Sequence, residues 1–192
     1  MGKLSPKREG KITGSMVGAA IGVNPHCSRQ KAYRLIKKIE IFEGNEFTDW
    51  GNDHEKDAIL SFEAITGEIV ENSHDEVFLE RDNLGITPDG NTGTHYIEAK
   101  CPFSLRIPDE VPPHYMAQAQ MGMELADLDK CYFIYWTPEK TRIFEIERSK
   151  AYWDEITPLI EDFNECLKTD TPPKRAKKPI IKSKIKQEII HG

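Results

Sequence analysis

The stretch ITPDGNTGTHYIEAK, residues 86–100, places two acids and a lysine (Asp89, Glu98 and Lys100) around a glycine-rich turn. A Gly/Asn cluster between two extended runs predicts a β-hairpin, which would return Asp89 to Glu98. Alternation along the second strand puts Glu98 and Lys100 on one face and Ala99 on the other. Neighbouring carboxylates repel each other unless a cation lies between them, and such oxygen ligands suit Mg²⁺ or Mn²⁺. With a lysine that orients water, these groups are the components of metal-assisted phosphodiester hydrolysis.

A third acid, Glu55, lies on a predicted helix that Asn52 or Asp53 caps and that runs to about Thr66. Glu55 shares the core-facing stripe of this helix because it precedes the apolar residues by three, four and seven positions. The stripe consists of Ala58, Ile59, Phe62 and Ile65. His54 faces roughly 100° away, so we expect Glu55 to join the acidic cluster. Taken alone, all these charges could equally be solvated side chains of a turn.

The elements that must position these residues follow from local patterns. We expect helices over residues 13–23, 28–38, 53–66, 114–126 and 149–167, and strands over 67–73, 75–81, 83–90, 95–101, 130–136 and 142–148. Strands gather in the middle of the chain and helices lie at both ends. This order predicts an α/β (α+β) fold with a central mixed sheet flanked by helices. The aromatic run Tyr132, Phe133, Tyr135 and Trp136 is then sheet core rather than a base-stacking platform.

Charge divides the chain into two parts. The segment 174–186, KRAKKPIIKSKIK, carries seven of the 26 lysine and arginine residues and no acid, whereas the whole chain has a net charge of -6. We therefore predict one domain over residues 1–170 and a basic C-terminal extension over 171–192. The acidic domain can approach DNA only where basic residues cluster or metal ions neutralise carboxylates. The extension is either solvated and mobile, or docks through its isoleucines on a neighbouring subunit, a partner or DNA.

The remaining composition excludes several classes of protein. The four cysteines are widely scattered without a CxxC pair, so we expect reduced, mostly buried thiols rather than disulfides, a zinc site or an iron–sulfur cluster. No apolar run approaches the roughly 18 residues that a membrane span requires. The basic start has no apolar segment typical of a secretory signal, so a cytoplasmic protein is expected.

Five blocks occur together and in order along residues 8–146. They are RxGxITGS at 8–15, WGNxxE at 50–55, PDG and EAKCP at 88–102, HYMAQAQMGM at 114–123, and FIYWTPEKTRIFEI at 133–146. This set resembles the lambda-exonuclease family of YqaJ-type viral recombinase nucleases, in the PD-(D/E)xK superfamily. The resemblance implies a restriction-endonuclease-like core.

The family resemblance also implies roles for the acidic residues. Asp89 and Glu98 would bind metal together with the backbone carbonyl of Ala99, and Lys100 would be the catalytic lysine. Glu55 would complete the acidic cluster. The implied cofactor is Mg²⁺, with Mn²⁺ as an alternative, at two ions per site.

A second implied site binds the terminal 5′-phosphate of a DNA end. The matching positions are Arg8, Ser15, Thr87 and Gln118, although the family more often has serine where Thr87 stands. Guanidinium, hydroxyl and amide donors suit a phosphate dianion. Ser15 could also cap a helix. Gln120 could contact substrate or pack in the core, and His114 is expected to begin a helix rather than bind metal.

The resemblance implies a Mg²⁺-dependent 5′-to-3′ exonuclease that digests double-stranded DNA ends and leaves 3′ single-stranded tails. It further implies a homotrimer, transfer of the tail to a single-strand annealing protein, and residence in a bacterial cytoplasm if the chain is encoded by a phage or prophage. The alternatives are a PD-(D/E)xK endonuclease, a Cas4-like nuclease and a DNA-end-binding protein without catalysis. Cas4-like proteins carry clustered cysteines, unlike this chain.

Overall fold

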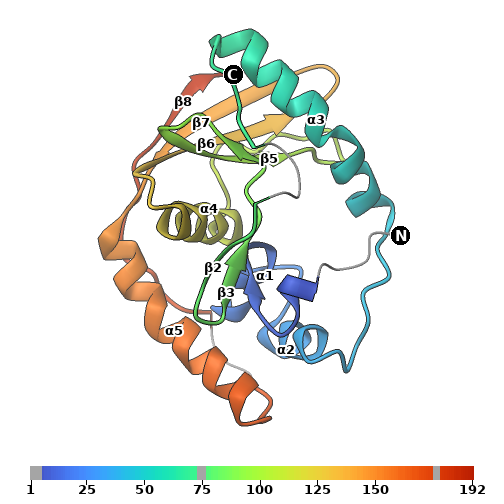
Figure 1. Cartoon of the computed structure of the whole chain (residues 1–192), viewed down its shortest axis with the longest axis vertical. Helices are drawn as coiled ribbons and strands as arrows, with labels where there is room; N and C mark the ends of the chain where they lie inside the picture. The colour runs from blue at the N-terminus through green and yellow to red at the C-terminus, as the bar shows by residue number, and fades with distance from the viewer. Residues whose placement is uncertain (1–5, 73–76, 175–177) are drawn as a thin grey trace.

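The computed structural model describes residues 6–72, 77–174 and 178–192 (Figure 1). In chain order its elements are η1 (Pro6–Arg8), β1 (Ile12–Thr13), α1 (Gly14–Ala20), α2 (Arg29–Ile36), α3 (Glu46–Thr66), β2 (Leu79–Arg81), β3 (Leu84–Ile86), β4 (Gly90–Asn91), β5 (His95–Lys100), α4 (Pro113–Ala126), β6 (Lys130–Trp136), β7 (Thr141–Glu147), α5 (Lys150–Lys168) and β8 (Gln187–His191). The strands form a five-stranded sheet, β4-β5-β6-β7-β8, and a three-stranded sheet, β1-β3-β2. The predicted class, a mixed sheet flanked by helices, is confirmed.

The five-stranded sheet lies between two helices. Its β5 and β6 run parallel, and every other neighbouring pair is antiparallel. A parallel pair needs a crossover, which α4 supplies. Helix α3 packs on β5, β6 and β7, whereas α4 lies on the opposite face against β5 and β6 (Figure 1). The chemistry-bearing strand β5 is therefore covered on both faces.

Alternation along β5 distributes its side chains between these two layers. Tyr96 packs in the large core that α1, α4 and α5 share, whereas Ile97 and Ala99 pack against α3. Glu98 follows the period of Tyr96 and faces α4. The predicted aromatic run of β6 is core as expected, with only Trp136 partly exposed.

Helix α1 approaches α4 closely because two of its residues lack side chains. A Cβ at Gly18 would lie 2.8 Å from the Cβ and 2.9 Å from the Cα of His114. A Cβ at Gly14 would lie 2.5 Å from Ile86 and 3.4 Å from Gln118. Glycine at both positions therefore brings the start of α1 against β3 and α4.

Several predicted boundaries differ from the structure. Helix α3 begins at Glu46, earlier than predicted, because Asn45 and Thr48 form a reciprocal capping box. The strand predicted over 67–73 is wrong for 67–72, where Glu71 makes only an isolated bridge to Asn91. Residue 73 and the start of the strand predicted over 75–81 lie outside the described residues, and β2 covers only Leu79–Arg81.

The described end of the chain is not a free extension. Strand β8 pairs antiparallel with β7, with Ile146 opposite Gln187 and Phe144 opposite Ile189. Before it, the backbone N–H of Lys182 donates to Glu155 on α5 at 2.9 Å. Of the two alternatives for the extension, a mobile tail is therefore wrong for β8, although its side chains stay largely exposed, and residues 175–177 lie outside the described residues. The position of the domain boundary stays a prediction.

Two further findings concern the composition. All four cysteines are free thiols, two buried and two partly buried, as expected. Among the described residues, no helix combines the length and the apolar character needed to cross a membrane.

Candidate active site

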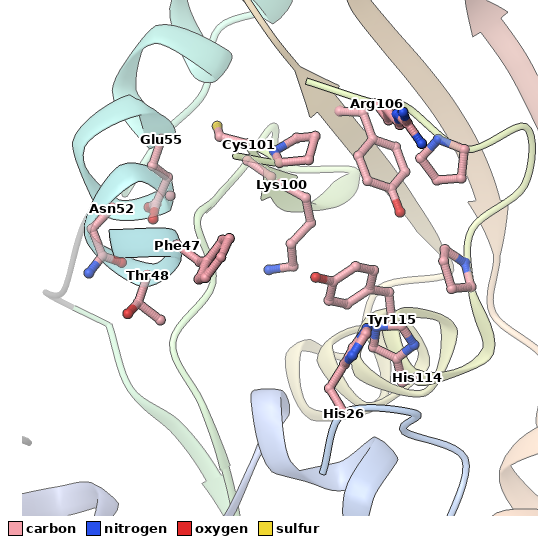
Figure 2. A pocket seen from close by; sticks show the side chains of 16 residues that line it. His26, Phe47, Thr48, Asn52, Glu55, Lys100, Cys101, Arg106, His114 and Tyr115 are labelled. Carbon is pink, nitrogen blue, oxygen red and sulfur yellow. The ribbon is translucent and has the colours of Figure 1, made fainter. Parts of the chain in front are cut away.

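A cavity of about 380 Å³ opens where the C-terminal half of β5 meets α3 and α4. Its lining includes Glu55 from α3, Lys100 from β5 and Tyr115 from α4. Figure 2 shows the Lys100 side chain between Glu55 on one side and Tyr115 on the other. The Lys100 ammonium lies 5.4 Å from the Tyr115 ring centroid. A cation, an acid and an aromatic ring from three elements thus share one pocket.

Asp89 lies beside Ala99, which lines this pocket, because β4 is much shorter than β5. Only Gly90 and Asn91 pair with β5, opposite Ile97 and Tyr96. Beyond this pairing, the Ala99 N–H donates to Oδ2 of Asp89 at 2.7 Å. The N–H and C=O of one strand residue point toward the same edge, so the Ala99 carbonyl points toward the Asp89 side of β5.

The turn that presents Asp89 depends on the glycine after it. Gly90 has φ +154°, and a Cβ there would lie 2.3 Å from the Val70 side chain. Only glycine allows this backbone to pass so close to the segment that follows α3. The predicted hairpin, with Asp89 returned to the end of β5, is confirmed.

Glu98 is almost completely buried, at 1% exposure, and both of its oxygens accept hydrogen bonds. Oε1 accepts from the Lys100 ammonium and from the Gln118 amide. Oε2 accepts from the Tyr96 hydroxyl at 2.8 Å. The surrounding donors hold this carboxylate in one orientation without exposing it to water.

Electrostatics in the pocket are dominated by crowded acids. Burial raises the pKa of Asp89 well above its usual range, and the Glu98 and Glu55 carboxylates raise it further. Burial lowers the pKa of Lys100, but Glu98 and Asp89 outweigh this effect and hold it above its ordinary value. Lys100 is therefore an ammonium at neutral pH, whereas Asp89 resists ionisation.

The donor set fits a hard divalent cation. The potential ligands, Asp89, Glu98, Glu55 and the Ala99 carbonyl, offer only oxygen atoms. Burial and then the repulsion between carboxylates raise the pKa of Asp89, and a bound cation would offset both effects. Within the ranges that the structure describes, no three His, Cys, Asp or Glu side chains already form a ligand cluster. Lys100 is instead the cation that contacts Glu98.

The predicted phosphate-binding residues come from four segments that meet beside this pocket. Arg8 Nη2 donates to the Thr87 hydroxyl at 2.6 Å, across 79 residues of sequence. Ser15 is exposed in the first turn of α1, and its hydroxyl lies 3.3 Å from that of Thr13. Gln118 lies against Gly14, the neighbour of Ser15. Because Gln118 also donates to Glu98, it links these polar groups to the acids.

Gln120 is the one predicted site residue that the structure places elsewhere. It is 1% exposed, and its amide donates to the Glu147 carbonyl at 2.8 Å. Its oxygen accepts from the Ser149 N–H, also at 2.8 Å. These contacts join α4 to the start of α5, so the geometry gives Gln120 a packing role rather than a substrate contact.

Sequence reasoning overlooked two residues of the site. Tyr96 holds Glu98, and strand alternation would have placed both on one face. Arg106 lines the cavity from the loop after β5 and has no hydrogen bond or ion pair within the described part of the chain. No periodic signal in that loop could have revealed it. His114, which also lines the cavity, lies in the first turn of α4 as predicted, and burial, His26 and Lys100 lower its pKa to about 4.

Three acids and a lysine define a nuclease of the PD-(D/E)xK type. One acid lies at the start of the hairpin, a second lies on its other strand two residues before the lysine, and the third lies on a flanking helix. Comparison with protein families identifies the chain further. The model of the YqaJ-like viral recombinase domain matches residues 5–129, and the chain belongs to that family.

Solved structures agree with this assignment. The chain is 25% identical to an alkaline exonuclease, LHK-Exo, from Laribacter hongkongensis, with a TM-score of 0.69 over 86% of this chain and 91% of that one. A phage-related exonuclease from Haemophilus somnus 129PT shares the fold at 17% identity, with a TM-score of 0.63 over 84% and 93% of the two chains. No curated protein sequence matches the chain significantly. The protein is accordingly an exonuclease that acts on DNA, a hydrolase of the recombinase-associated class.

Proposed function

We propose that this nuclease is a Mg²⁺-dependent 5′-to-3′ exonuclease that acts on double-stranded DNA ends and leaves 3′ single-stranded tails for annealing. The observation that carries the proposal is the position of Gln118, which contacts Glu98 while it lies beside the segments of Arg8, Ser15 and Thr87. A group bound by these polar residues would lie next to the acids. A terminal phosphate is the part of a DNA end that such donors suit.

Asp89, Glu98 and the Ala99 carbonyl would hold the metal, with Glu55 completing the cluster for two ions of Mg²⁺, or alternatively Mn²⁺. When bound, such ions activate a water and stabilise the leaving oxygen of a phosphodiester. The protein fixes the ligands beforehand. Tyr96 holds one oxygen of Glu98, and the Ala99 N–H holds one oxygen of Asp89.

Lys100 would orient the attacking water and offset charge on the scissile phosphate. Its elevated pKa keeps the proton on Nζ, so it serves as a donor rather than as a base. Burial against Tyr115 and β5 limits the directions in which Nζ can point. A positioned cation at a developing negative charge is worth far more in such a pocket than in water.

Family membership further supports, as proposals, a homotrimer and transfer of the 3′ tail to a single-strand annealing protein in the cytoplasm of a bacterial host. The domain over residues 1–170 would carry catalysis.

The direct test is digestion of linear duplex DNA with Mg²⁺ by the wild type and by Asp89→Ala and Lys100→Ala. We expect both variants to lose at least about 100-fold in rate. Lys150→Ala removes an exposed lysine of α5 that pairs with Asp154 and serves as the matched control. Undiminished digestion by both active-site variants would refute the assignment.

Polarity and the phosphate pocket need a second test. Duplexes labelled at one strand and carrying either a 5′-phosphate or a 5′-hydroxyl should differ in digestion rate, with the phosphorylated end faster. Arg8→Ala should reduce this difference. Equal rates on both ends would be compatible with a nuclease but would contradict the 5′-phosphate pocket. Cleavage of covalently closed circles would favour an endonuclease.

A further inference from the structure

The loop over residues 101–112, between β5 and α4, forms one wall of the active-site cavity. Cys101, Pro102, Arg106, Pro108 and Pro112 from this loop line the pocket. The loop contains no helix or strand, and one backbone hydrogen bond, from Leu105 to Pro102, closes within its described residues. Because the loop has so few hydrogen bonds of its own, its conformation depends on contacts with the rest of the protein.

The C-terminal strand holds the far end of this loop. The backbone N–H of Val111 donates to the side-chain oxygen Oε1 of Gln187, on β8, at 3.1 Å. Val111 is only 5% exposed. A buried N–H that loses its acceptor is strongly disfavoured, so this hydrogen bond favours one position of the loop.

The same end of the sheet holds the middle of the loop. Arg142, on β7, donates from Nη1 to the Pro108 carbonyl at 2.9 Å. The residue after β8 lies against this arginine, since a Cβ at Gly192 would lie 3.2 Å from Arg142 Nε. Together with the ion pair between Arg142 and Asp109, these contacts connect β7 and β8 to the pocket wall.

Arg106 lies between the start of the loop and these two anchors. It is exposed, lines the cavity, and has no ion pair or hydrogen bond within the described residues. Figure 2 shows Arg106 on the loop side of the pocket, across from Glu55. An uncommitted guanidinium at the mouth of a pocket suits a phosphate of a bound strand.

We propose that Gln187 is a positioning residue for DNA binding: β8 fixes loop 101–112 through the Val111 N–H and thereby places Arg106 against the phosphate backbone. This inference rests on the proposed function of the pocket. Under this proposal β8, at the end of the basic extension, contributes to substrate binding although it does not itself line the cavity.

The test compares Gln187→Leu, which removes the acceptor at similar volume, with Gln187→Glu, which keeps it. For Gln187→Leu we expect KM on linear duplex, and the Kd of labelled duplex measured with Ca²⁺ in place of Mg²⁺, to rise about 2- to 10-fold, the effect of one hydrogen bond. The kcat should stay within about twofold because the acids are untouched. Gln187→Glu at physiological salt should restore both KM and Kd.

A second comparison separates positioning from general stability. In an Arg106→Ala background, Gln187→Leu should add no further rise in Kd, because the contact that it positions is already gone. A wild-type Kd for Gln187→Leu, an equal defect in Gln187→Glu, or full additivity with Arg106→Ala would each overturn the inference. Absence of digestion by the wild type would refute the proposed function instead, and the Kd comparison would still decide the role of Gln187.

Discussion

The hydroxyl of Tyr96 provides the sharpest test of how the active site is built. It donates to Glu98 Oε2 at 2.8 Å, and the whole Tyr96 side chain is buried in the core beneath α4. Tyr96→Phe deletes one oxygen atom and leaves the ring in place. The variant therefore removes support from a buried carboxylate without creating a large cavity.

The expected loss follows from the character of this hydrogen bond. A bond to a charged acceptor contributes about 1.5–3 kcal/mol, more than a neutral one, and Glu98 is too buried for water to replace the donor. For a chain of this size, each kcal/mol lowers Tm by about 2–4 °C. Tyr96→Phe should therefore lower Tm by about 3–12 °C in the absence of metal.

Thermal unfolding of purified variants measures this shift. The matched control is Tyr152→Phe, because the Tyr152 hydroxyl is buried and has no hydrogen-bond partner among the described residues. Its removal should leave Tm unchanged or raise it slightly. If Tyr96→Phe changed Tm by less than 1 °C, or no more than Tyr152→Phe did, the reasoning that Tyr96 stabilises the Glu98 carboxylate would be wrong. We also expect a higher Mg²⁺ requirement for digestion by Tyr96→Phe.

Two further variants test the site and its scaffold. The pKa of Asp89 is raised in the folded protein relative to its value of about 3.8 in the unfolded chain. The protonated Asp89 therefore stabilises the folded state below pH 3.8, and this stabilisation is lost as the pH rises through the pKa of the folded state. Without metal, Asp89→Asn should therefore have a higher Tm than the wild type at pH 7–8 and an equal Tm in acid. Excess Mg²⁺ should reverse the order of the two Tm values at pH 7–8. A lower Tm for the metal-free variant at neutral pH would contradict this reasoning. Gly18→Ala should lower Tm by about 2–12 °C, since overpacking against the His114 backbone costs about 1–3 kcal/mol. The control is Gly51→Ala in α3, because a Cβ at Gly51 would have no heavy atom within 4 Å. This variant should raise Tm slightly. Equal shifts in Tm for the two glycine variants would count against close packing of α1 on α4.

Much of the site was predictable because its parts follow local rules. The Gly/Asn cluster between extended runs predicted the hairpin that brings Asp89 to the Ala99 N–H. Strand alternation placed Glu98 with Lys100, which contact each other. The helical stripe placed Glu55 toward the pocket, which it lines.

What escaped prediction depends on pairings between distant segments. Strand β8 lies in a basic, isoleucine-rich tail with the composition of a solvated segment, and its position in the sheet depends on pairing with β7. Gln187 and Val111 are 76 residues apart, and no periodicity links them. The start of α3 was missed for a local reason, since the Asn45–Thr48 capping box precedes the apolar stripe used to find the helix.

The glycine contacts of α1 have a consequence for engineering this enzyme. Gly18 places the α1 backbone against the His114 backbone of α4, and Gly14 places it against the side chains of Ile86 and Gln118, so glycine at both positions limits the distance between Ser15 and Gln118. Mutant libraries aimed at solubility or thermostability can vary much of the remaining core, where neighbouring side chains can repack. They should keep these two positions constant, because a methyl group there would collide with Ile86 at Gly14 and with His114 at Gly18.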